Sequence, residues 1–456
     1  MNDEKWFLNI NVCVISLGCP KNLVDSEIML GKIKAAGLEP VILPEEAQVI
    51  IVNTCGFIES AKAEAIQTIL DMSEYNSKLI VTGCLAERYS EEIIKDLPEV
   101  DAVVGTGNYK DIVSAIEGVL GIGDNAFKTV KSAQDSEDFL SVEYLDSERL
   151  VSTSKSYAYL KVAEGCDNKC AYCVIPSIRG RFRSRSMESI INEARKLVND
   201  GFKEIILVAQ DTTGYGRDLY DKRMLAVLLK EICDISGDFR VRIMYCYPDG
   251  ITDEFIEIMA GNEKICSYMD LPVQHGCDCI LKAMNRRSLS EEIKEKITIL
   301  RKRIPNIYIR TSIIVGFPGE TEEDFDVLKE FVKEIRFDRL GVFMYSREEG
   351  TIADKMPNHV SEDTKEKRMS ELMRIQQKIS AENNEKRLGK EYNVVVEGLT
   401  EDKLFYIGRT YAEAPEIDGC VYFTAHEELF VGDKVKVKIL NVEEYDLIGE
   451  QVDEFA

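Results

Sequence analysis

The chain carries the stretch Gly165-Cys166-Asp167-Asn168-Lys169-Cys170-Ala171-Tyr172-Cys173, on which the organisation of the rest depends. Its three cysteines stand at i, i+4 and i+7, a spacing that would also suit three buried thiols on one helix face. Glycine before the run, Asp-Asn within it and proline after it are instead typical of a loop. The run follows a strand-like segment, residues 157–163, so we place it at the carboxyl end of a strand. Thiolates on such a loop can converge on one metal cluster.

The number of cysteines in this stretch is informative. A cluster of four irons is normally held by four thiolates. With three thiolates one iron keeps an open position, as a catalytic zinc does with three protein ligands. A substrate can then bind the metal directly, so the pattern favours catalysis.

Cys-x3-Cys-x2-Cys after the first strand of an α/β domain resembles the signature of the radical S-adenosylmethionine (SAM) superfamily. The resemblance implies that the open iron binds the amino and carboxylate groups of SAM. One electron from the cluster then splits the sulfonium and yields a 5′-deoxyadenosyl radical. The cofactor supplies this chemistry, while the protein positions it and excludes water.

Length and composition set the broad class. The 456 residues suffice for two or three domains, and the net charge is −24. No apolar run is long enough for a signal peptide or a membrane span, so we expect a cytoplasmic protein without a membrane partner. Thirteen cysteines in such a chain favour metal binding or catalysis over disulfides. So acidic a surface would repel nucleic acid unless a local basic patch exists. The alternative interpretation is that the acidic surface simply keeps the protein soluble.

Residues 9–121 alternate between strand and helix patterns, which predicts an open parallel α/β domain. Cys19, Cys55 and Cys84 each follow a short β-rich run. The carboxyl ends of parallel strands share one edge of a sheet, where ligands bind. These cysteines are therefore expected to meet and to hold a second cluster with one open iron, although three unrelated core cysteines are the alternative. Cys13 lies inside a strand pattern and is interpreted as core.

We interpret residues 122–155 as a linker and residues 156–388 as a second α/β domain. Strand-like runs start near Tyr157, Glu204, Arg240, Tyr268, Tyr308 and Arg339, and helical patterns cover residues 186–200, 221–235, 251–261, 278–303 and 321–335. Six βα units predict an incomplete, TIM-like (βα)6 barrel, because a full barrel usually needs about 250 residues.

Polar side chains near the carboxyl rim of that barrel are candidates for SAM binding, since catalytic groups lie there. The predicted contacts are Tyr172, Gln210, Gln274, Arg310 and Glu320. Polar strand ends of this kind are also compatible with ordinary turn or cap chemistry.

Residues 389–456 change to short alternating strands, at 392–396, 404–407, 421–423 and 435–439. This pattern predicts a small OB-like β-barrel. Such barrels often bind nucleic acid through basic grooves. Residues 390–456 hold 16 Asp and Glu but 6 Lys and Arg, so this barrel lacks that charge.

Over essentially its whole length the chain resembles the radical-SAM methylthiotransferases, whose C-terminal barrel is of the TRAM type. One branch of that family modifies tRNA, and the RimO branch modifies a ribosomal protein. Residues 16–27, 207–213 and 345–351 resemble the RimO branch. The tRNA branch tends to carry Gly-Cys-Gln-Met-Asn where this chain has Gly18-Cys-Pro-Lys-Asn22.

The resemblance implies methylthiolation of the β-carbon of an aspartate in small-subunit ribosomal protein S-twelve. It also implies two [4Fe-4S] clusters, one on Cys166, Cys170 and Cys173 that cleaves SAM, and an auxiliary one that delivers sulfur. The auxiliary ligands are Cys19, Cys55 and Cys84. An electron donor such as flavodoxin or ferredoxin and a sulfur source are further expected partners. An acidic enzyme surface would attract a basic ribosomal protein.

His275-Gly-Cys277-Asp-Cys279 departs from the family pattern. We interpret its cysteines as structural or incidental, because a soft-metal site needs more ligands than this run provides. We also take four further cysteines as buried, Cys233, Cys246, Cys266 and Cys420.

Three other functions remain open at this point. A tRNA methylthiotransferase would need a basic face. A non-catalytic iron–sulfur electron carrier or a zinc-stabilised structural protein would more often close its sites with four ligands.

Overall fold

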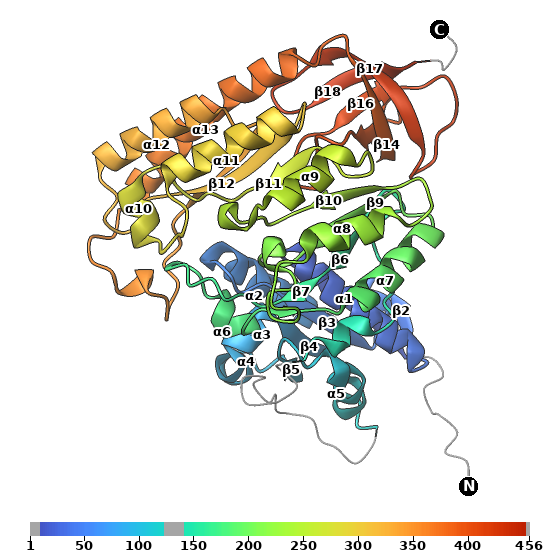
Figure 1. Ribbon diagram of the computed structural model, residues 1–456. Coiled ribbons are helices and arrows are strands. Elements are labelled where there is room, and N and C mark those ends of the chain that lie inside the picture. Colours follow the sequence, from blue (N-terminus) through green and yellow to red (C-terminus); the bar gives the residue numbers. More distant parts are fainter. Residues whose placement is uncertain (1–9, 123–140, 453–456) are drawn as a thin grey trace.

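The computed structural model describes residues 10–122 and 141–452, which form three successive parts (Figure 1). Residues 1–9, residues 123–140 of the expected linker and residues 453–456 of the expected C-terminal domain lie outside them. Within the described ranges, none of the helices combines the length and apolar character that crossing a bilayer requires.

Five parallel strands form the N-terminal sheet in the order β2-β1-β3-β4-β5. The strands are β1 (Asn11–Ser16), β2 (Glu39–Val41), β3 (Val49–Thr54), β4 (Lys78–Gly83) and β5 (Ala102–Val104). The helices are α1 (Pro20–Ala35), α2 (Glu59–Ser73), α3 (Cys84–Arg88), α4 (Ser90–Asp96) and α5 (Ile112–Val119). Helices α1 and α5 pack on one face and α2, α3 and α4 on the other, so the central strand β3 is wholly buried. The predicted open parallel domain is confirmed, and Cys13 lies in its core.

Six parallel strands form the central domain in two three-stranded sheets, β6-β9-β10 and β11-β12-β13, joined by a bridge between Val241 and Ile265. The strands are β6 (Ala158–Lys161), β9 (Glu204–Val208), β10 (Arg240–Ile243), β11 (Tyr268–Asp270), β12 (Tyr308–Val315) and β13 (Arg339–Met344). Helices α7 (Met187–Asn199), α8 (Leu225–Cys233), α9 (Asp253–Gly261), α11 (Ser290–Arg303) and α12 (Glu322–Ile335) cover its outside. The predicted incomplete (βα)6 barrel is confirmed, and each of the six strands starts within one residue of its predicted position.

The single helix predicted over residues 278–303 is wrong. The structure has α10 (Asp278–Ala283) and α11, separated by a loop. Asn285 ends α10 in the left-handed conformation, at φ 57°, which asparagine tolerates at the end of a helix. Its side chain donates to the carbonyl of Lys169 at 2.6 Å, so this loop contacts the cysteine stretch.

A long helix, α13 (Glu362–Glu385), leads to the C-terminal barrel, which is closed in the order β14-β15-β16-β18-β17. The strands are β14 (Glu391–Leu399), β15 (Tyr406–Arg409), β16 (Val421–Thr424), β17 (Lys434–Val442) and β18 (Leu447–Gln451). The barrel was predicted, but β18 was missed because it has few apolar residues. It closes the barrel by pairing parallel to β16 and antiparallel to β17.

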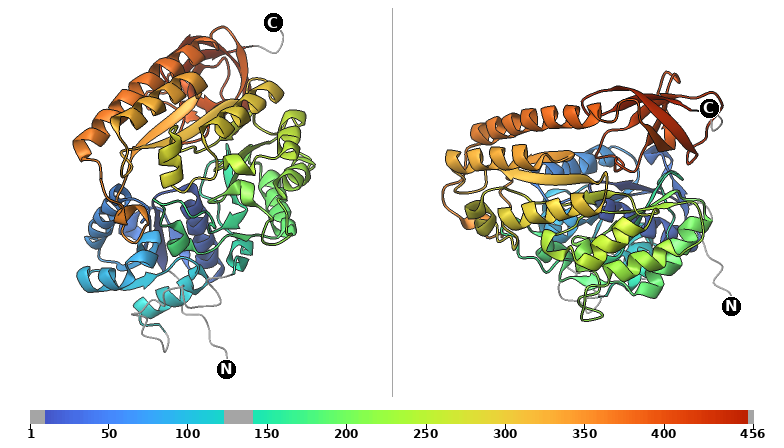
Figure 2. Two further views of the ribbon diagram at one scale, coloured as in Figure 1. Left: turned by 60° about the vertical axis from the view of Figure 1, so that its left-hand side comes forward. Right: turned by 45° about the horizontal axis from the view of Figure 1, so that its top comes forward.

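Both neighbouring parts fill the inside of the central half barrel. Tyr159 and Tyr268 on its strands pack with Val24 and Ile28 of α1 and with Ala414, from the segment between β15 and β16. Figure 2 shows the N-terminal domain (blue) and the C-terminal barrel (red) against different sides of the central domain. The start of α1 lies at the carboxyl rim of the central strands, because Lys21 contacts Tyr245 just beyond β10.

A buried ionic cluster attaches the C-terminal barrel to the amino ends of the central strands. Glu204, the first residue of β9, pairs with Arg240 at 2.6 Å, Arg242 at 2.5 Å and Arg409 at 3.2 Å. Arg409 comes from the C-terminal barrel and also pairs with Glu397 at 2.7 Å. Buried charges of this kind are tolerated only when they are paired.

Glu413 makes a second such attachment. It is buried and pairs with Arg387 and, at 3.4 Å, with Arg339 of β13. Burial alone would raise the pKa of the Glu413 carboxyl, but Arg387 and Arg339 outweigh burial and lower it to about 2 from the usual 4.5.

We predict that Glu413→Gln destabilises the protein in a pH-dependent way. A carboxyl whose pKa is lowered by folding stabilises the fold above its unfolded pKa, and the contribution is lost as the pH falls through the folded pKa. The shift corresponds to about 3 kcal/mol at neutral pH. Urea unfolding should therefore separate wild type from variant at pH 7, and the difference should shrink between pH 4.5 and 2. The exposed Glu401→Gln is the control, and a difference independent of pH would contradict the assignment.

Candidate active site: two cysteine triads joined by a buried ionic network

The first triad, Cys166, Cys170 and Cys173, lies on a loop that follows the short strand β7 (Ala163–Glu164). Gly165 has φ +76°, and a Cβ atom there would lie 2.1 Å from the carbonyl of Arg181, so only glycine fits. The N–H of Cys166 donates to Gly180 at 3.1 Å. The predicted loop is confirmed, and a helix through the three cysteines is excluded.

The thiols of the first triad are largely withdrawn from water. Burial raises the pKa of Cys166 to about 11 and that of Cys173 to about 12, and the neighbouring thiols add to both shifts. The Tyr247 hydroxyl lies 3.4 Å from Cys170 Sγ, and the Arg286 guanidinium stacks on the Tyr247 ring at 4.4 Å. Without a metal the Cys166 and Cys173 thiols stay protonated near neutral pH, and metal binding is what would deprotonate them.

The second triad, Cys19, Cys55 and Cys84, lies at the carboxyl ends of β1, β3 and β4. Strand register already brings these ends together, because Ser16 pairs with Asn53 and Thr54 pairs with Gly83. The structure therefore assembles three cysteines that are far apart in the chain.

A glycine stands beside each cysteine of the second triad, and each is packed too closely for a larger residue. A Cβ atom on Gly18 would lie 2.7 Å from Cys55 Cβ, and one on Gly56 would lie 2.8 Å from Leu85 Cα. One on Gly83 would lie 2.3 Å from Asn53 Oδ1. The three loops thus form one close-packed cradle around the thiols.

The two triads suit a multi-iron cluster better than a single ion. Among the described residues, neither triad has all its sulfur atoms within 4.8 Å of one another, the separation that one ion would need. Burial and Cys84 raise the pKa of Cys55 to about 12. Burial would also raise the pKa of Cys19, but Lys21 and Arg179 outweigh it and lower that pKa. Three thiols at each site match an iron–sulfur cluster with one open iron.

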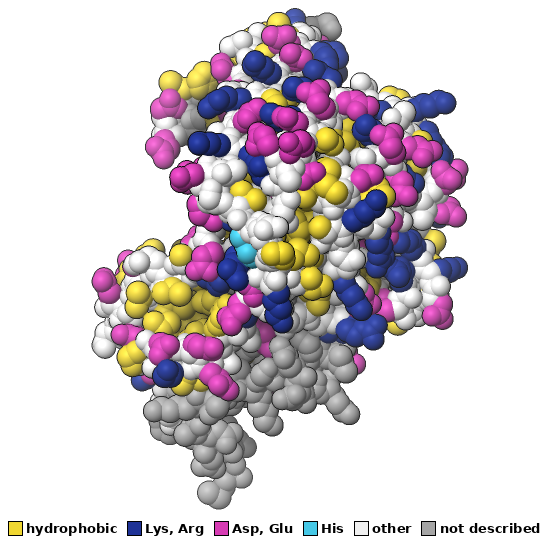
Figure 3. Space-filling model, turned by 90° about the vertical axis from the view of Figure 1, so that its left-hand side faces the viewer, with side chains coloured by type: hydrophobic (Ala, Val, Ile, Leu, Met, Phe, Trp, Pro, Cys, Tyr) yellow, Lys and Arg dark blue, Asp and Glu magenta, His cyan; other side chains and the backbone are white. Residues whose placement is uncertain are grey.

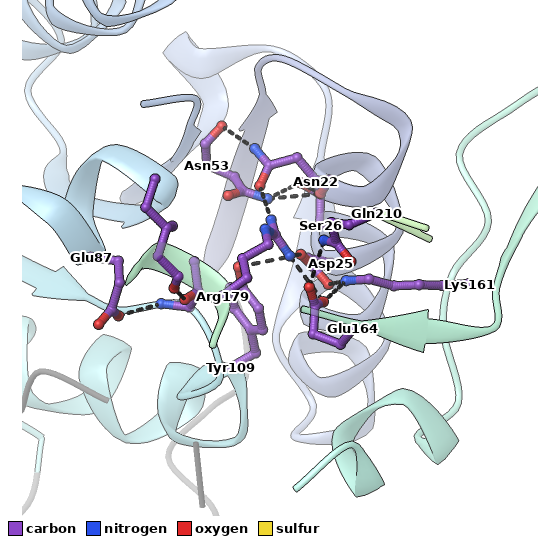
Figure 4. A network of polar contacts seen from close by, with 12 residues as sticks. Asn22, Asp25, Ser26, Asn53, Glu87, Tyr109, Lys161, Glu164, Arg179 and Gln210 are labelled. Atoms are coloured by element: carbon purple, nitrogen blue, oxygen red, sulfur yellow. Dashed lines mark hydrogen bonds and ion pairs between the residues drawn. The ribbon is translucent and has the colours of Figure 1, made fainter. Parts of the chain in front are cut away.

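Arg179 joins the segment that follows the first triad to helix α1 of the N-terminal domain through buried ion pairs (Figure 4). It ends α6 (Ile175–Arg179), which follows the first triad directly. Its Nη1 lies 2.9 Å from Asp25 of α1 and 3.0 Å from Glu164 of β7. Lys161 Nζ lies 2.6 Å from Asp25 and also pairs with Glu164. Two cations and two carboxylates, all buried, therefore neutralise one another.

Hydrogen bonds extend this network to the second triad. Arg179 Nη2 donates to Asn22 Oδ1 at 3.1 Å, and Asn53 Nδ2 donates to the Asn22 carbonyl at 2.9 Å and to Ser26 Oγ at 2.8 Å. Asn53 lies two residues before Cys55. The same side chains therefore hold α6, α1 and the end of β3.

A second contact between the domains fixes the Cys55 loop. Glu348, in the loop after β13, lies 2.6 Å from Arg88 of α3 and 3.1 Å from Lys62 of α2. Arg88 also donates to the carbonyl of Gly56 at 3.1 Å. The polar stretch at the sixth strand end is thus used to bind the N-terminal domain.

The five predicted SAM contacts have different surroundings. Gln210 Nε2 donates to Glu164 at 2.7 Å, while its buried Oε1 has no hydrogen-bond partner among the described residues. Gln274 adopts a left-handed backbone, φ 75°, which is uncommon outside glycine and is often found at functional sites. Tyr172 lies beside the first triad, where burial and Cys170 raise the pKa of its hydroxyl.

The other two predicted contacts are already engaged by the protein. Arg310 pairs with Asp270 at 2.9 Å and with Asp418 of the C-terminal barrel at 3.6 Å. Glu320 accepts the N–H of Gly316 at 2.8 Å and pairs with Arg368 at 2.9 Å. The structure does not bring all five around one site, and the SAM assignments stay predictions.

Sequence reasoning missed several residues at this site. Arg179 follows the first triad in an Arg-Gly-Arg run, which could have marked it as an anion-binding residue. Lys21 and Tyr245 had no local signal.

Away from this site, the Sγ atoms of Cys277 and Cys279 lie 2.8 Å apart. Asp324 Oδ1 lies 3.2 Å from Cys277 Sγ and 2.9 Å from Cys279 Sγ, so Asp324 is a third possible metal ligand that the sequence could not show. Their interpretation as incidental thiols stays a prediction.

Comparisons with known proteins agree with the three parts of the chain. Residues 11–105 match the model of a family described as Uncharacterized protein family UPF0004, residues 160–332 match the Radical SAM superfamily, and residues 388–452 match the TRAM domain. The ribosomal protein uS12 methylthiotransferase RimO of Acetivibrio thermocellus is 54% identical over 447 residues, which are 97% of this chain and 98% of that protein. The protein of the same name from Clostridioides difficile is 48% identical over 455 residues, 98% and 100% of the two chains.

Two solved structures share the fold. The radical SAM methyltransferase TsrM from Kitasatospora setae has a TM-score of 0.56 at 14% identity, covering 73% of this chain and 72% of that one. The cobalamin-dependent radical SAM enzyme OxsB has a TM-score of 0.51 at 13% identity, covering 82% and 56%. At these identities the likeness concerns the fold alone.

We predict that Arg179→Met destabilises the protein by about 3–5 kcal/mol, because it leaves Lys161 as the one cation paired with Asp25 and Glu164 among the described residues. Chemical unfolding of the metal-free protein measures the loss without any contribution from a cluster. Arg181→Met is the matched control, since that side chain is 84% exposed and its ion pair is with Asp167, at 3.4 Å. Surface pairs of this kind contribute about 0–1 kcal/mol. Equal losses in the two variants would refute the role given to Arg179.

Proposed function

The chain belongs to the ribosomal protein uS12 methylthiotransferase (RimO) family of radical SAM enzymes, and we propose that it transfers a methylthio group to the β-carbon of an aspartate in uS12. The observation that carries this proposal is the pair of three-cysteine sites held on either side of one buried ionic network. Each triad offers three thiols and leaves an iron open, which suits two different reactants meeting in one space.

In this proposal the first triad holds a [4Fe-4S] cluster that binds SAM. When bound, this group supplies a carbon radical able to remove a hydrogen atom from an unactivated C–H bond. No side-chain acid or base could remove that hydrogen as a proton, so the chain's own work is to position reactants and exclude water. Tyr247 and Arg286 cover the Cys170 side, and Gln210, with its unpaired buried Oε1, is suited to bind SAM.

The second triad is proposed to hold the auxiliary [4Fe-4S] cluster that presents sulfur. The glycine cradle supports this role, because the close packing at Gly18, Gly56 and Gly83 fixes the loops that carry Cys19, Cys55 and Cys84. Arg179, Asn22 and Asn53 are proposed as positioning residues that keep the two sites at one separation. A fixed separation would direct the substrate carbon to the sulfur and not to solvent.

Charge favours a protein over RNA as the substrate. The chain has a net charge of −24, and Arg409, the only arginine after residue 389, is buried and engaged by Glu204 and Glu397. On the face shown in Figure 3, acidic and basic side chains are intermixed over the upper part, and a hollow separates it from the lower lobe. A basic ribosomal protein would be attracted by the net charge of −24, whereas RNA needs a basic groove.

The proposal also includes an electron donor, a sulfur source and a cellular location. The radical reaction requires an electron donor, such as a flavodoxin or ferredoxin, and the transfer requires a source of sulfur. We place the reaction in the cytoplasm, where uS12 is made.

The first test compares the two substrate classes directly. Anaerobically reconstituted, reduced protein receives SAM and sulfide with either uS12 or bulk tRNA, and products are analysed by mass spectrometry. We expect a methylthio mass gain on one aspartyl peptide of uS12 and none on tRNA. A gain on tRNA alone would overturn the proposal in favour of a tRNA methylthiotransferase.

The second test separates the two triads. Cys84→Ala should lose about half of the bound iron and all methylthio transfer, yet still form 5′-deoxyadenosine from SAM. Cys170→Ala should lose both reactions, because SAM is proposed to bind at the first triad. Cys13→Ala, a buried thiol of the same domain, is the matched control and should keep both. Methylthio transfer by Cys84→Ala would contradict the role of the second triad.

A further inference from the structure

A buried lysine lies beside the second triad without a carboxylate partner among the described residues. Lys21, the second residue of α1, follows Cys19 by two positions and is 8% exposed. Its Nζ lies 3.2 Å from the centroid of the Tyr245 ring. Among residues 10–122 and 141–452 no carboxylate comes within 4.0 Å of this ammonium group, the limit used for every ion pair described above.

The carboxylates in this region are already engaged. Asp25, one turn along α1, is shared by Lys161 and Arg179. Asp270 pairs with Arg310 at 2.9 Å and accepts the Tyr245 N–H, also at 2.9 Å. Removing an ammonium group from water is costly, and an aromatic face compensates only part of that cost. The neighbours of the Lys21 ammonium group, with its three N–H donors, are the Tyr245 ring and Cys19, and they include no carboxylate among the described residues.

The partner ring is held in a strained position. Tyr245 lies two residues beyond β10 and has φ 61°, a left-handed conformation that is unusual for a bulky residue. Two backbone hydrogen bonds fix it, from its N–H to Asp270 and from Thr212 N–H to its carbonyl at 3.0 Å. Strain of this kind persists where the surroundings over-determine it, commonly at ligand sites.

The position of the pair relates it to both triads. Lys21 comes from the helix that begins at Cys19, whereas Tyr245 comes from the carboxyl rim of the domain that carries the first triad. A ligand that reached the Lys21 ammonium would therefore stand at the junction of the two domains.

We infer that Lys21 binds the side-chain carboxylate of the substrate aspartate, with the Tyr245 ring beneath the ammonium group. This inference rests on the proposed function and names how its substrate is recognised. A charge-assisted hydrogen bond would complete the buried cation, and it would hold the β-carbon, one bond from the carboxylate carbon, beside the Cys19 loop. Asparagine, which has no charge, would leave the ammonium unpaired and bind less well.

The test measures binding and not only turnover. Kd values for uS12 and for uS12 with asparagine at the modified position are measured by competition, with SAM present, on reconstituted wild type, Lys21→Met and Lys21→Arg. A hydrogen bond to a charged group contributes about 1.5–3 kcal/mol, so wild type should bind the aspartate form about 10- to 100-fold more tightly. Lys21→Met should lose this preference and Lys21→Arg should keep part of it. Lys34→Met, on the exposed side of α1, should behave as wild type.

Two further readouts keep the inference falsifiable. Iron content and SAM cleavage without uS12 are measured alongside, and Lys21→Arg, which keeps the positive charge beside Cys19, should retain both. Loss of iron from the second triad, or equal weakening of both uS12 forms, would mean that Lys21 serves the cluster and would overturn the inference. A wild type that binds but never modifies uS12 would instead refute the proposed function.

Discussion

The buried pairing of Arg179 and Lys161 with Asp25 and Glu164 is the constraint on which the rest of the structure depends. These residues come from α6, β6, α1 and β7, so one neutral cluster of four charges ties the first triad to the N-terminal domain. Each charge alone would be costly in the interior, and together they permit essentially one arrangement of the two domains. The buried charges therefore help to place the triads relative to each other, together with the apolar cluster in which Cys84 packs against Val174 and Ile178.

The half barrel explains why the other domains are needed. Six strands leave an open side and a concave interior that would expose tyrosine side chains such as Tyr159 and Tyr268. Helix α1 covers that interior from one side, and the segment around Ala414 covers it from another. The pairs at Glu204 and Glu413 fasten the C-terminal barrel at the amino ends of the strands. The carboxyl rim, where the first triad lies, is left for reactants.

The local sequence pattern was sufficient to predict where the cysteines lie, but not to predict the ion pairs that join the two cysteine sites. Cys19, Cys55 and Cys84 could be placed at one edge because parallel strands end together, a rule that needs no tertiary detail. Arg179 and Asp25 are 154 positions apart, and no periodicity connects them. The break before α11 had a signal in Asn285, a residue that favours helix ends, but the helical pattern on both sides obscured it. Lys21 became notable only when burial and the absence of a nearby carboxylate were known.

The most direct test of the account follows one hydrogen atom from substrate to SAM. The central claim is that the substrate carbon lies between the two triads and loses hydrogen on the side of the first. Prepared with deuterium on the β-carbon of its aspartates, uS12 would be incubated with reduced protein and SAM. We predict deuterium in 5′-deoxyadenosine, in proportion to methylthiolated uS12. Methylthiolated uS12 accompanied by 5′-deoxyadenosine free of deuterium would contradict the account.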